Sequence, residues 1–209
     1  MNIGFLASHN GSNMQAIIDA CKAGTLKAIP AVIVSNNGDS GALARAEKEG
    51  IPGYHLSSKT YLNPEELDQA ILDAMLKHEV DIIVLAGYMK KLGTRTLSRF
   101  SGRILNIHPA LLPKYGGKGM YGMRVHEAVL AAGETETGVT IHVVDSDYDT
   151  GPIIAQARVP VEPTDTAQTL AARVLKQEHI LYPEVLKKII TGDIEIPNPK
   201  HTEKKIEKH

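Results

Sequence analysis

Three short stretches of the chain carry polar side chains that could do chemistry. They are the loop Ser8-His-Asn-Gly-Ser-Asn13, the pair Asn106 and His108 before a proline, and the acidic run Asp145-Ser-Asp-Tyr-Asp149. An amide, an imidazole and a carboxylate suit direct acyl transfer to an outside amine. Such a reaction needs a donor at the oxyanion of a tetrahedral intermediate, and a group that moves the amine proton to the leaving nitrogen.

The first stretch lies where a strand should lead into a helix. Backbone amides at a helix N-terminus bind anions, Gly11 would let the chain approach a phosphate closely, and Ser12 and Asn13 would add side-chain donors. A helix cap is the alternative, because Ser and Asn are preferred there. The glycine pattern of a dinucleotide fingerprint and the Gly-Lys of a P-loop are both missing from this loop.

The second stretch follows a buried strand. Asn106 and His108 are two residues apart, so in an extended strand both face the same side. A structural histidine at a strand end is the alternative for His108 by itself. The pairing with Asn106 and the closing Pro109 favour a functional site.

The third stretch, Asp145 to Pro152, places three acids at alternating positions of a loop. Alternating oxygen ligands resemble a calcium loop, but the closing Glu of that motif is missing, which argues against a metal. A solvated turn is a second alternative and would account for Asp145 and Asp147, whereas we expect Asp149 to point inward. A carboxylate beside His108 would favour the protonated imidazole.

Elements that could position these residues alternate along the first half of the chain. Strand–helix–strand alternation predicts an α/β fold, a mostly parallel twisted sheet flanked by helices, with ligands at the carboxyl ends of its strands. The expected strands are Asn2–Leu6, Ile29–Ser35, Tyr54–Leu56, Ile82–Ala86 and Ile104–Ile107, and the expected helices are Asn13–Ala23, Ala42–Glu49 and Pro64–His78.

The pattern changes after Gly138. We expect two strands, Val139–Val144 and Ile153–Val161, and then an amphipathic helix, Thr166–Ile190, which Pro183 should kink or split. Residues 1–196 are predicted to form one domain, and the polar residues 197–209 a loose tail.

Composition narrows the class of protein. The 209 residues are 43% hydrophobic and 22% charged, with a net charge of −1 and a pI near 6.8, which argues against a nucleic-acid partner. The single cysteine, Cys21, excludes an internal disulfide and indicates a reducing compartment. Neither a signal peptide nor an apolar run of membrane-spanning length is visible, so we expect a cytoplasmic protein without a membrane partner. A homo-oligomer is compatible with the sequence, which does not reveal the oligomeric state.

Four motifs together resemble the phosphoribosylglycinamide formyltransferases, within the folate-dependent formyltransferase superfamily. They are SHNGSNMQAII, VLAGYMKKL, NIHPALLPKYGGKG and GVTIHVVDSDYDTGPIIAQ, in the family's order, and the resemblance covers about Met1 to Pro183. It implies a Rossmann-like formyltransferase fold and two small-molecule substrates. The formyl group would pass from the co-substrate 10-formyltetrahydrofolate to the amine of glycinamide ribonucleotide in purine biosynthesis, without a metal.

The resemblance also implies roles for individual residues. The catalytic residues would be Asn106, His108 and Asp149; the ribonucleotide and its phosphate would be bound by Gly11, Ser12, Asn13 and Glu178; the folate would lie along Met89, Lys90, Leu92, Thr140, His142 and Asp145. Two positions depart from relatives. An Arg that reaches the phosphate in some of them is replaced by Asn63-Pro64, and a Lys three residues before the Glu is replaced by Leu175.

Two features of the segment after His108 stay open. The resemblance implies a cis peptide between Leu112 and Pro113. The glycine-rich run Tyr115–Gly122 is either a flexible surface loop or a mobile flap over the site.

Three rival functions are considered. A methionyl-tRNA formyltransferase would be expected to carry a further C-terminal domain and a basic surface, and a formyltetrahydrofolate deformylase an N-terminal regulatory domain. A non-catalytic nucleotide-binding module would account for the loop at Gly11 but not for Asn106, His108 and Asp149.

Overall fold

The computed structural model describes residues 1–196, and the predicted tail at 197–209 lies outside the described residues. Seven strands form one mostly parallel sheet with helices between them, as the sequence predicted. Their order, which the sequence did not predict, is β3-β2-β1-β4-β5-β6-β7. The chain divides into two compact units, Met1–Leu105 and the part from Asn106 onward. The prediction of one domain over residues 1–196 stays a prediction.

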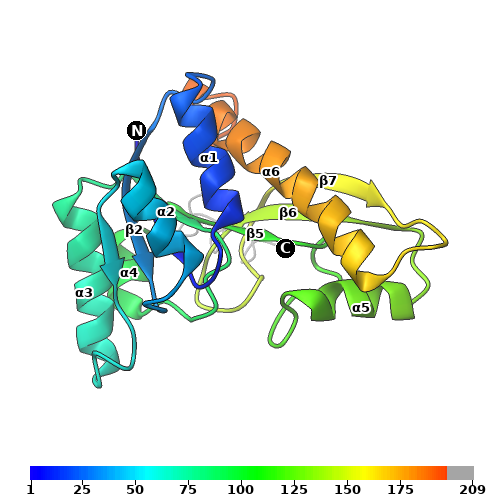
Figure 1. Cartoon of the computed structure of the whole chain (residues 1–209), viewed down its shortest axis with the longest axis horizontal. Helices are drawn as coiled ribbons and strands as arrows, with labels where there is room; N and C mark the ends of the chain where they lie inside the picture. Colours follow the sequence, from blue (N-terminus) through cyan, green and yellow to red (C-terminus); the bar gives the residue numbers. More distant parts are fainter. Residues whose placement is uncertain (197–209) are drawn as a thin grey trace, which may run out of the picture. The chain divides into compact units, whose positions relative to one another are not determined.

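The first unit is a parallel arrangement of strands with helical connections. β1 pairs in parallel with β2 and β4, and β2 with β3. Helix α1 lies beside α2, and α3 packs against α4 (Figure 1). The bounds are β1 Asn2–Ala7, α1 Ser12–Lys22, β2 Ile29–Ser35, α2 Gly41–Glu49, β3 Gly53–His55, α3 Pro64–Lys77, β4 Ile82–Leu85 and α4 Thr94–Arg99.

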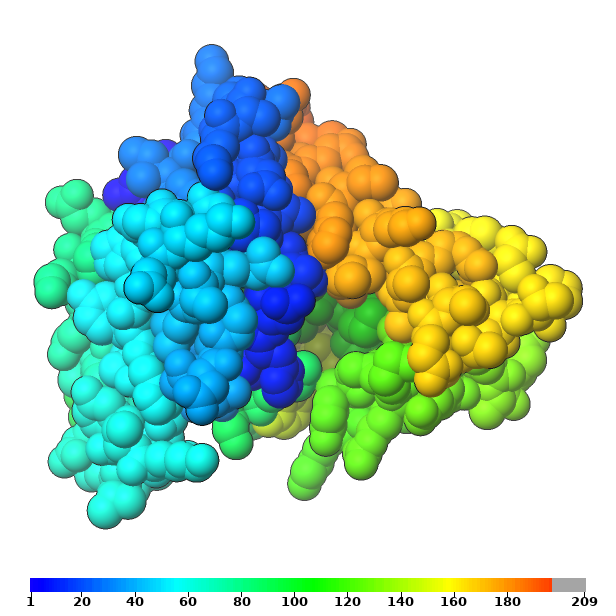
Figure 2. All heavy atoms as spheres, viewed as in Figure 1, coloured from blue at the N-terminus to red at the C-terminus, as the bar shows by residue number. Residues whose placement is uncertain are grey.

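The second unit carries an antiparallel pair of strands covered by helices. β6 pairs with β7, and α6 packs on both strands and on α5 (Figure 1). The outer face of α6, in orange, is open to solvent in the space-filling view (Figure 2). The bounds are β5 Ile104–His108, which spans the boundary between the units, then α5 Met123–Ala131, β6 Glu136–Val143, β7 Ile153–Pro160 and α6 Ala167–Thr191.

The predicted elements agree with the structure to within a few residues, but the sequence analysis missed α4 and α5. Pro183 lies inside α6 and does not split it. The Leu112–Pro113 peptide is cis, which confirms that prediction. Among the described residues, no helix is long and apolar enough to cross a membrane.

A contact with helix α3 accounts for the position at which α4 begins. Its N-cap, Gly93, has no side chain that could cap the helix. The carboxylate of Asp68, on α3, instead accepts hydrogen bonds from the backbone amides of Arg95 (2.7 Å) and Thr96 (3.2 Å). A negative charge at a helix N-terminus is favourable, so a distant residue sets where α4 begins.

Candidate active site

The second unit brings Asn106, His108 and Asp149 into one cluster around a fourth residue, His142. The Asp149 carboxylate lies between two imidazoles: Oδ2 is 3.5 Å from His108 Nδ1, and Oδ1 is 3.4 Å from His142 Nε2. Asn106 Nδ2 is 3.1 Å from the same nitrogen of His142. Both histidines are buried, and Asp149 is partly exposed.

Strand geometry explains why these side chains meet. Asn106 and His108 lie two apart on β5, so both point to one side of the sheet, as predicted. His142 stands near the end of β6, and Asp149 follows in the loop before β7. Asp149 itself has a left-handed backbone, with φ 59°, a conformation that is uncommon for residues other than glycine and recurrent at functional sites.

Hydrogen bonds to carbonyl groups fix the tautomer of each neutral histidine. His142 Nδ1 is 3.0 Å from the Val143 carbonyl oxygen, which can only accept, so Nδ1 carries the proton. His142 Nε2 is then an acceptor for the Asn106 amide. By the same reasoning His108 Nε2 donates to the Tyr115 carbonyl oxygen at 2.7 Å, which leaves Nδ1 facing Asp149.

The charges in this cluster oppose the effects of burial. Burial lowers the pKa of His108 below its ordinary value, although Asp149 and the Tyr115 carbonyl act to raise it. The net direction is therefore opposite to our expectation that Asp149 keeps His108 charged. Burial also acts to raise the pKa of Asp149, but His142, His108 and the Gly117 amide outweigh it and hold that pKa below its usual value.

The glycine-rich run contacts this cluster through its backbone. The Gly117 amide donates to Asp149 Oδ2 at 2.9 Å. A Cβ on Gly116 would lie 2.4 Å from Leu112 Cδ2 and 3.3 Å from the Asp149 Cβ, so only glycine fits without a shift. The start of the run is thus part of the wall around the carboxylate.

The other residues of the acidic loop fold the loop itself. Asp145 accepts hydrogen bonds from the Asp147 amide (3.1 Å) and from the Thr150 hydroxyl (2.8 Å). Asp147 is exposed, as a solvated turn would have it, and Asp149 is the acid that faces the site. Within residues 1–196, no group of three or more His, Cys, Asp or Glu is arranged to hold a metal ion.

The Thr140 hydroxyl forms hydrogen bonds with the backbone of the segment that follows His108. It donates to the Ala110 carbonyl (2.7 Å) and accepts from the Leu112 amide (3.0 Å) and from Gln156 Nε2 (2.9 Å). These bonds give Thr140 a structural role in shaping the segment after His108.

The loop at Gly11 lies in the first unit. Gly11 is the N-cap of α1, with φ 67°, and no side chain caps the helix. Ser12 and Asn13 are the first residues of the helix, so the structure does not support the helix-cap alternative. Arg45 holds the loop from outside through bonds from Nε to the Asn10 carbonyl (2.8 Å) and from a guanidinium nitrogen to Gln15 (3.1 Å).

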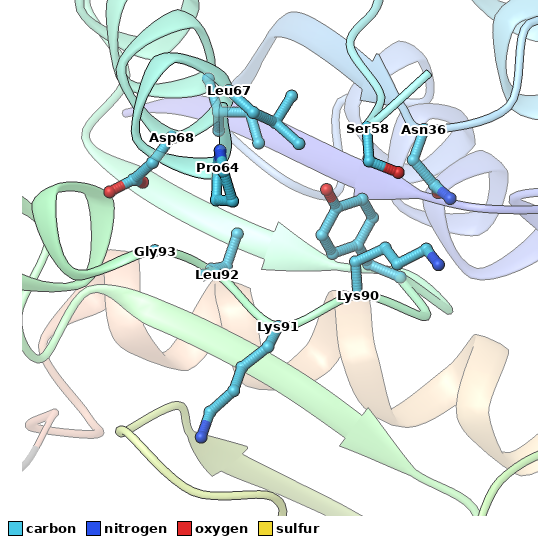
Figure 3. Close-up of a pocket in the computed structure, with 11 residues that line it drawn as sticks. Asn36, Ser58, Pro64, Leu67, Asp68, Lys90, Lys91, Leu92 and Gly93 are labelled. Atoms are coloured by element: carbon cyan, nitrogen blue, oxygen red, sulfur yellow. The ribbon is translucent and has the colours of Figure 1, made fainter. Parts of the chain in front are cut away.

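A cavity of about 340 Å³ in the first unit contains two of the predicted folate residues, Lys90 and Leu92. Leu92 points toward Pro64 on α3, whereas the Lys90 ammonium reaches the end of the cavity where Asn36 and Ser58 lie (Figure 3). The cavity therefore has an apolar wall and a polar end. The exposed Met89 is not part of its lining, but its backbone amide donates to Ser8 Oγ at 2.7 Å.

Glu178, the predicted ribonucleotide contact, lies in the second unit on the buried side of α6. Its side chain is among the few buried carboxylates, and its charge adds to burial in raising the pKa of Tyr182. The link from His142 to Asn106 was not predicted from the sequence, because it joins side chains 36 residues apart.

The chain is similar to known proteins in both sequence and fold. Residues 1–186 match the family described as Formyl transferase. The phosphoribosylglycinamide formyltransferase of Haemophilus influenzae is 42% identical over 194 residues, which cover 93% of this chain and 89% of that protein. The chloroplastic enzyme of Vigna unguiculata is 47% identical over 86% of this chain, which spans only 57% of that relative. The crystal structure of glycinamide ribonucleotide transformylase 1 from Symbiobacterium toebii aligns with a TM-score of 0.87 at 36% identity, covering 94% of this chain and 91% of that one.

Proposed function

The chain belongs to the phosphoribosylglycinamide formyltransferase family, and from that membership we propose that it transfers the formyl group of 10-formyltetrahydrofolate to the amine of 5'-phosphoribosylglycinamide. The reaction is a step of purine biosynthesis, and the folate is a co-substrate. The single observation that carries the proposal is the Asp149 carboxylate placed between two buried imidazoles, with the Asn106 amide on one of them.

The proposed reaction needs no covalent intermediate with the protein. The neutral amine attacks the formyl carbon, a carbon–nitrogen bond forms, and the carbonyl oxygen becomes an oxyanion. Asn106 uses one amide hydrogen on His142 and has a second for the oxyanion. The bond to the folate nitrogen then breaks, and that nitrogen receives the proton that the amine gave up.

His108 is proposed to move this proton. Because burial lowers its pKa, the imidazole starts neutral, with Nδ1 unprotonated and facing Asp149. It can therefore accept the amine proton. The imidazolium that results is stabilised by Asp149 and adds a positive charge near the oxyanion until the proton reaches the folate nitrogen.

The remaining site assignments belong to the same proposal. The α1 N-terminus at Gly11, Ser12 and Asn13 binds the substrate phosphate, supported by the uncapped helix end, and Glu178 contacts the ribonucleotide. Folate contacts are assigned to Met89, Lys90, Leu92, Thr140, His142 and Asp145. For Thr140 and Asp145 this role is indirect, because both side chains bind their own loops.

One assay tests the reaction against its rivals. The protein is incubated with 10-formyltetrahydrofolate, with and without glycinamide ribonucleotide, and both released tetrahydrofolate and formylated ribonucleotide are measured. We expect release that depends on the amine and matches the formylated product. Equal release without the amine would identify a deformylase, and an absence of turnover a binding module; either result contradicts the proposal.

A further inference from the structure

The backbone of Tyr115 is held in a conformation that its residue type does not favour. Its φ is 56°, in the left-handed region where a bulky aromatic residue is strained, although two glycines follow directly. In this conformation the Tyr115 carbonyl oxygen lies 2.7 Å from His108 Nε2. A strained residue persists only when its surroundings hold it, so the contacts of its side chain are informative.

Those contacts converge on one carboxylate. The Tyr115 hydroxyl donates to Glu134 Oε1 at 2.9 Å, and Lys114 Nζ lies 2.8 Å from the same oxygen. Lys114 and the tyrosine hydroxyl together lower the pKa of Glu134, which is therefore ionised at neutral pH. A hydrogen bond to an ionised acceptor is stronger than one between neutral groups.

Glu134 is itself well anchored. It lies in the turn between α5 and β6, and its amide donates to the Val129 carbonyl at 3.3 Å. The preceding amide, of Gly133, donates to the Leu130 carbonyl at 3.0 Å. The backbone of Glu134 is thus held by the last turn of α5, outside the glycine-rich run.

We propose that Glu134 and Tyr115 are positioning residues for the reaction: the Glu134 carboxylate holds the Tyr115 phenol, and the phenol holds the carbonyl that His108 Nε2 donates to. The inference rests on the proposed function and adds two residues to it. A fixed acceptor at Nε2 keeps the proton of neutral His108 on that nitrogen, so Nδ1 remains the proton-accepting nitrogen beside Asp149.

The variants Tyr115→Phe and Glu134→Gln test this device, and Lys114→Met is the matched control. The first two remove or weaken the bond between the phenol and the carboxylate, whereas the control removes the other partner of the same oxygen. We expect kcat to fall about two- to tenfold in the first two, as for one lost hydrogen bond, with an unchanged KM for the ribonucleotide. The control should keep the wild-type kcat.

A nitrogen NMR titration of His108 in the free protein supplies the readout that a purely structural role would not move. The His108 signal is assigned with His108→Gln. We expect neutral His108 to be protonated on Nε2 in the wild type and in Lys114→Met. Tyr115→Phe and Glu134→Gln should mix the tautomers and lower the pKa of His108, since the Tyr115 carbonyl acts to raise it.

Two results would overturn the inference. One is an unchanged His108 tautomer and kcat in both Tyr115→Phe and Glu134→Gln. The other is a loss in Lys114→Met equal to that in Glu134→Gln, which would assign the effect to local charge. If the wild type transfers no formyl group, the proposed function fails, and the titration still decides whether these two residues position His108.

Discussion

At the scale of single residues, several unusual features meet at Asp149. It combines a left-handed backbone, two imidazoles within 3.5 Å and an amide from the glycine-rich run. Burial acts against the charged carboxylate, yet these surroundings together hold the pKa of Asp149 below its usual value. In the proposed mechanism, Asp149 stabilises the positive charge that His108 gains during proton transfer.

Replacing Asp149 with Asn removes the negative charge but keeps the size and shape of the side chain. We expect Asp149→Asn to lower kcat by at least about a hundredfold, comparable to the loss of an oxyanion donor, and His108→Ala to do the same. Binding of the ribonucleotide should stay nearly intact. The pKa of His108 should fall further in Asp149→Asn, because the neighbouring negative charge acts to raise it. Steady-state kinetics and direct substrate binding check these effects, and near-normal turnover of His108→Ala would contradict the mechanism.

The sequence predicted the members of this cluster better than their protonation. The spacing of Asn106 and His108 predicted that both face one side of a strand, and the resemblance to the family pointed to Asp149. The pKa of His108 could not be read in the same way, because the outcome depends on how much burial outweighs one carboxylate. Tyr115 escaped notice since its role lies in its carbonyl group, which every residue type has.

At the scale of secondary-structure elements, sequence patterns predicted the elements that carry their own signals. Pro64 and the acids after it mark the start of α3, and Thr166 caps α6, both near the predicted positions. Helix α4 has no such signal because its cap is Asp68, on another helix. Helix α5 begins after Gly122 without a side-chain cap or an acid in its first turn, so no helix was predicted there from the sequence.

The start of α1 gives a test of phosphate binding at this scale. We expect Asn13→Ala to raise the KM for the ribonucleotide about ten- to hundredfold, as for one charge-assisted hydrogen bond, with little change in the KM for the folate. Kinetics with each substrate varied in turn measure both constants. Equal effects on the two would contradict the assignment of Gly11, Ser12 and Asn13 to the phosphate.

At the scale of the whole molecule, buried histidines couple stability to pH. Burial lowers the pKa of both His108 and His126, and at His126 the neighbouring His108 contributes as well. Their folded-state pKa values lie below those of the unfolded chain, which therefore binds more protons as the pH falls. Stability from the neutral imidazoles is present above the unfolded value of about 6.5 and is lost as the pH drops through it.

This linkage predicts an acid-sensitive fold. We expect the midpoint of thermal unfolding to fall between pH 7 and pH 5, and to fall less in His126→Gln than in the wild type. His9→Gln, at an exposed position, is the control and should follow the wild type. Calorimetry at several pH values provides the measurement, and a midpoint that stays constant over this range would contradict the prediction.

The residues that contact one another in the cluster are far apart in the sequence, and this separation bears on how activity returns during refolding. Asn106 and His142 are 36 residues apart, and Gly117 and Asp149 are 32 apart. A contact between residues far apart in the sequence requires the chain between them to close, which costs conformational entropy. We therefore expect recovery of activity during refolding to report the completion of the β5–β6 region and of the loop that carries Asp149.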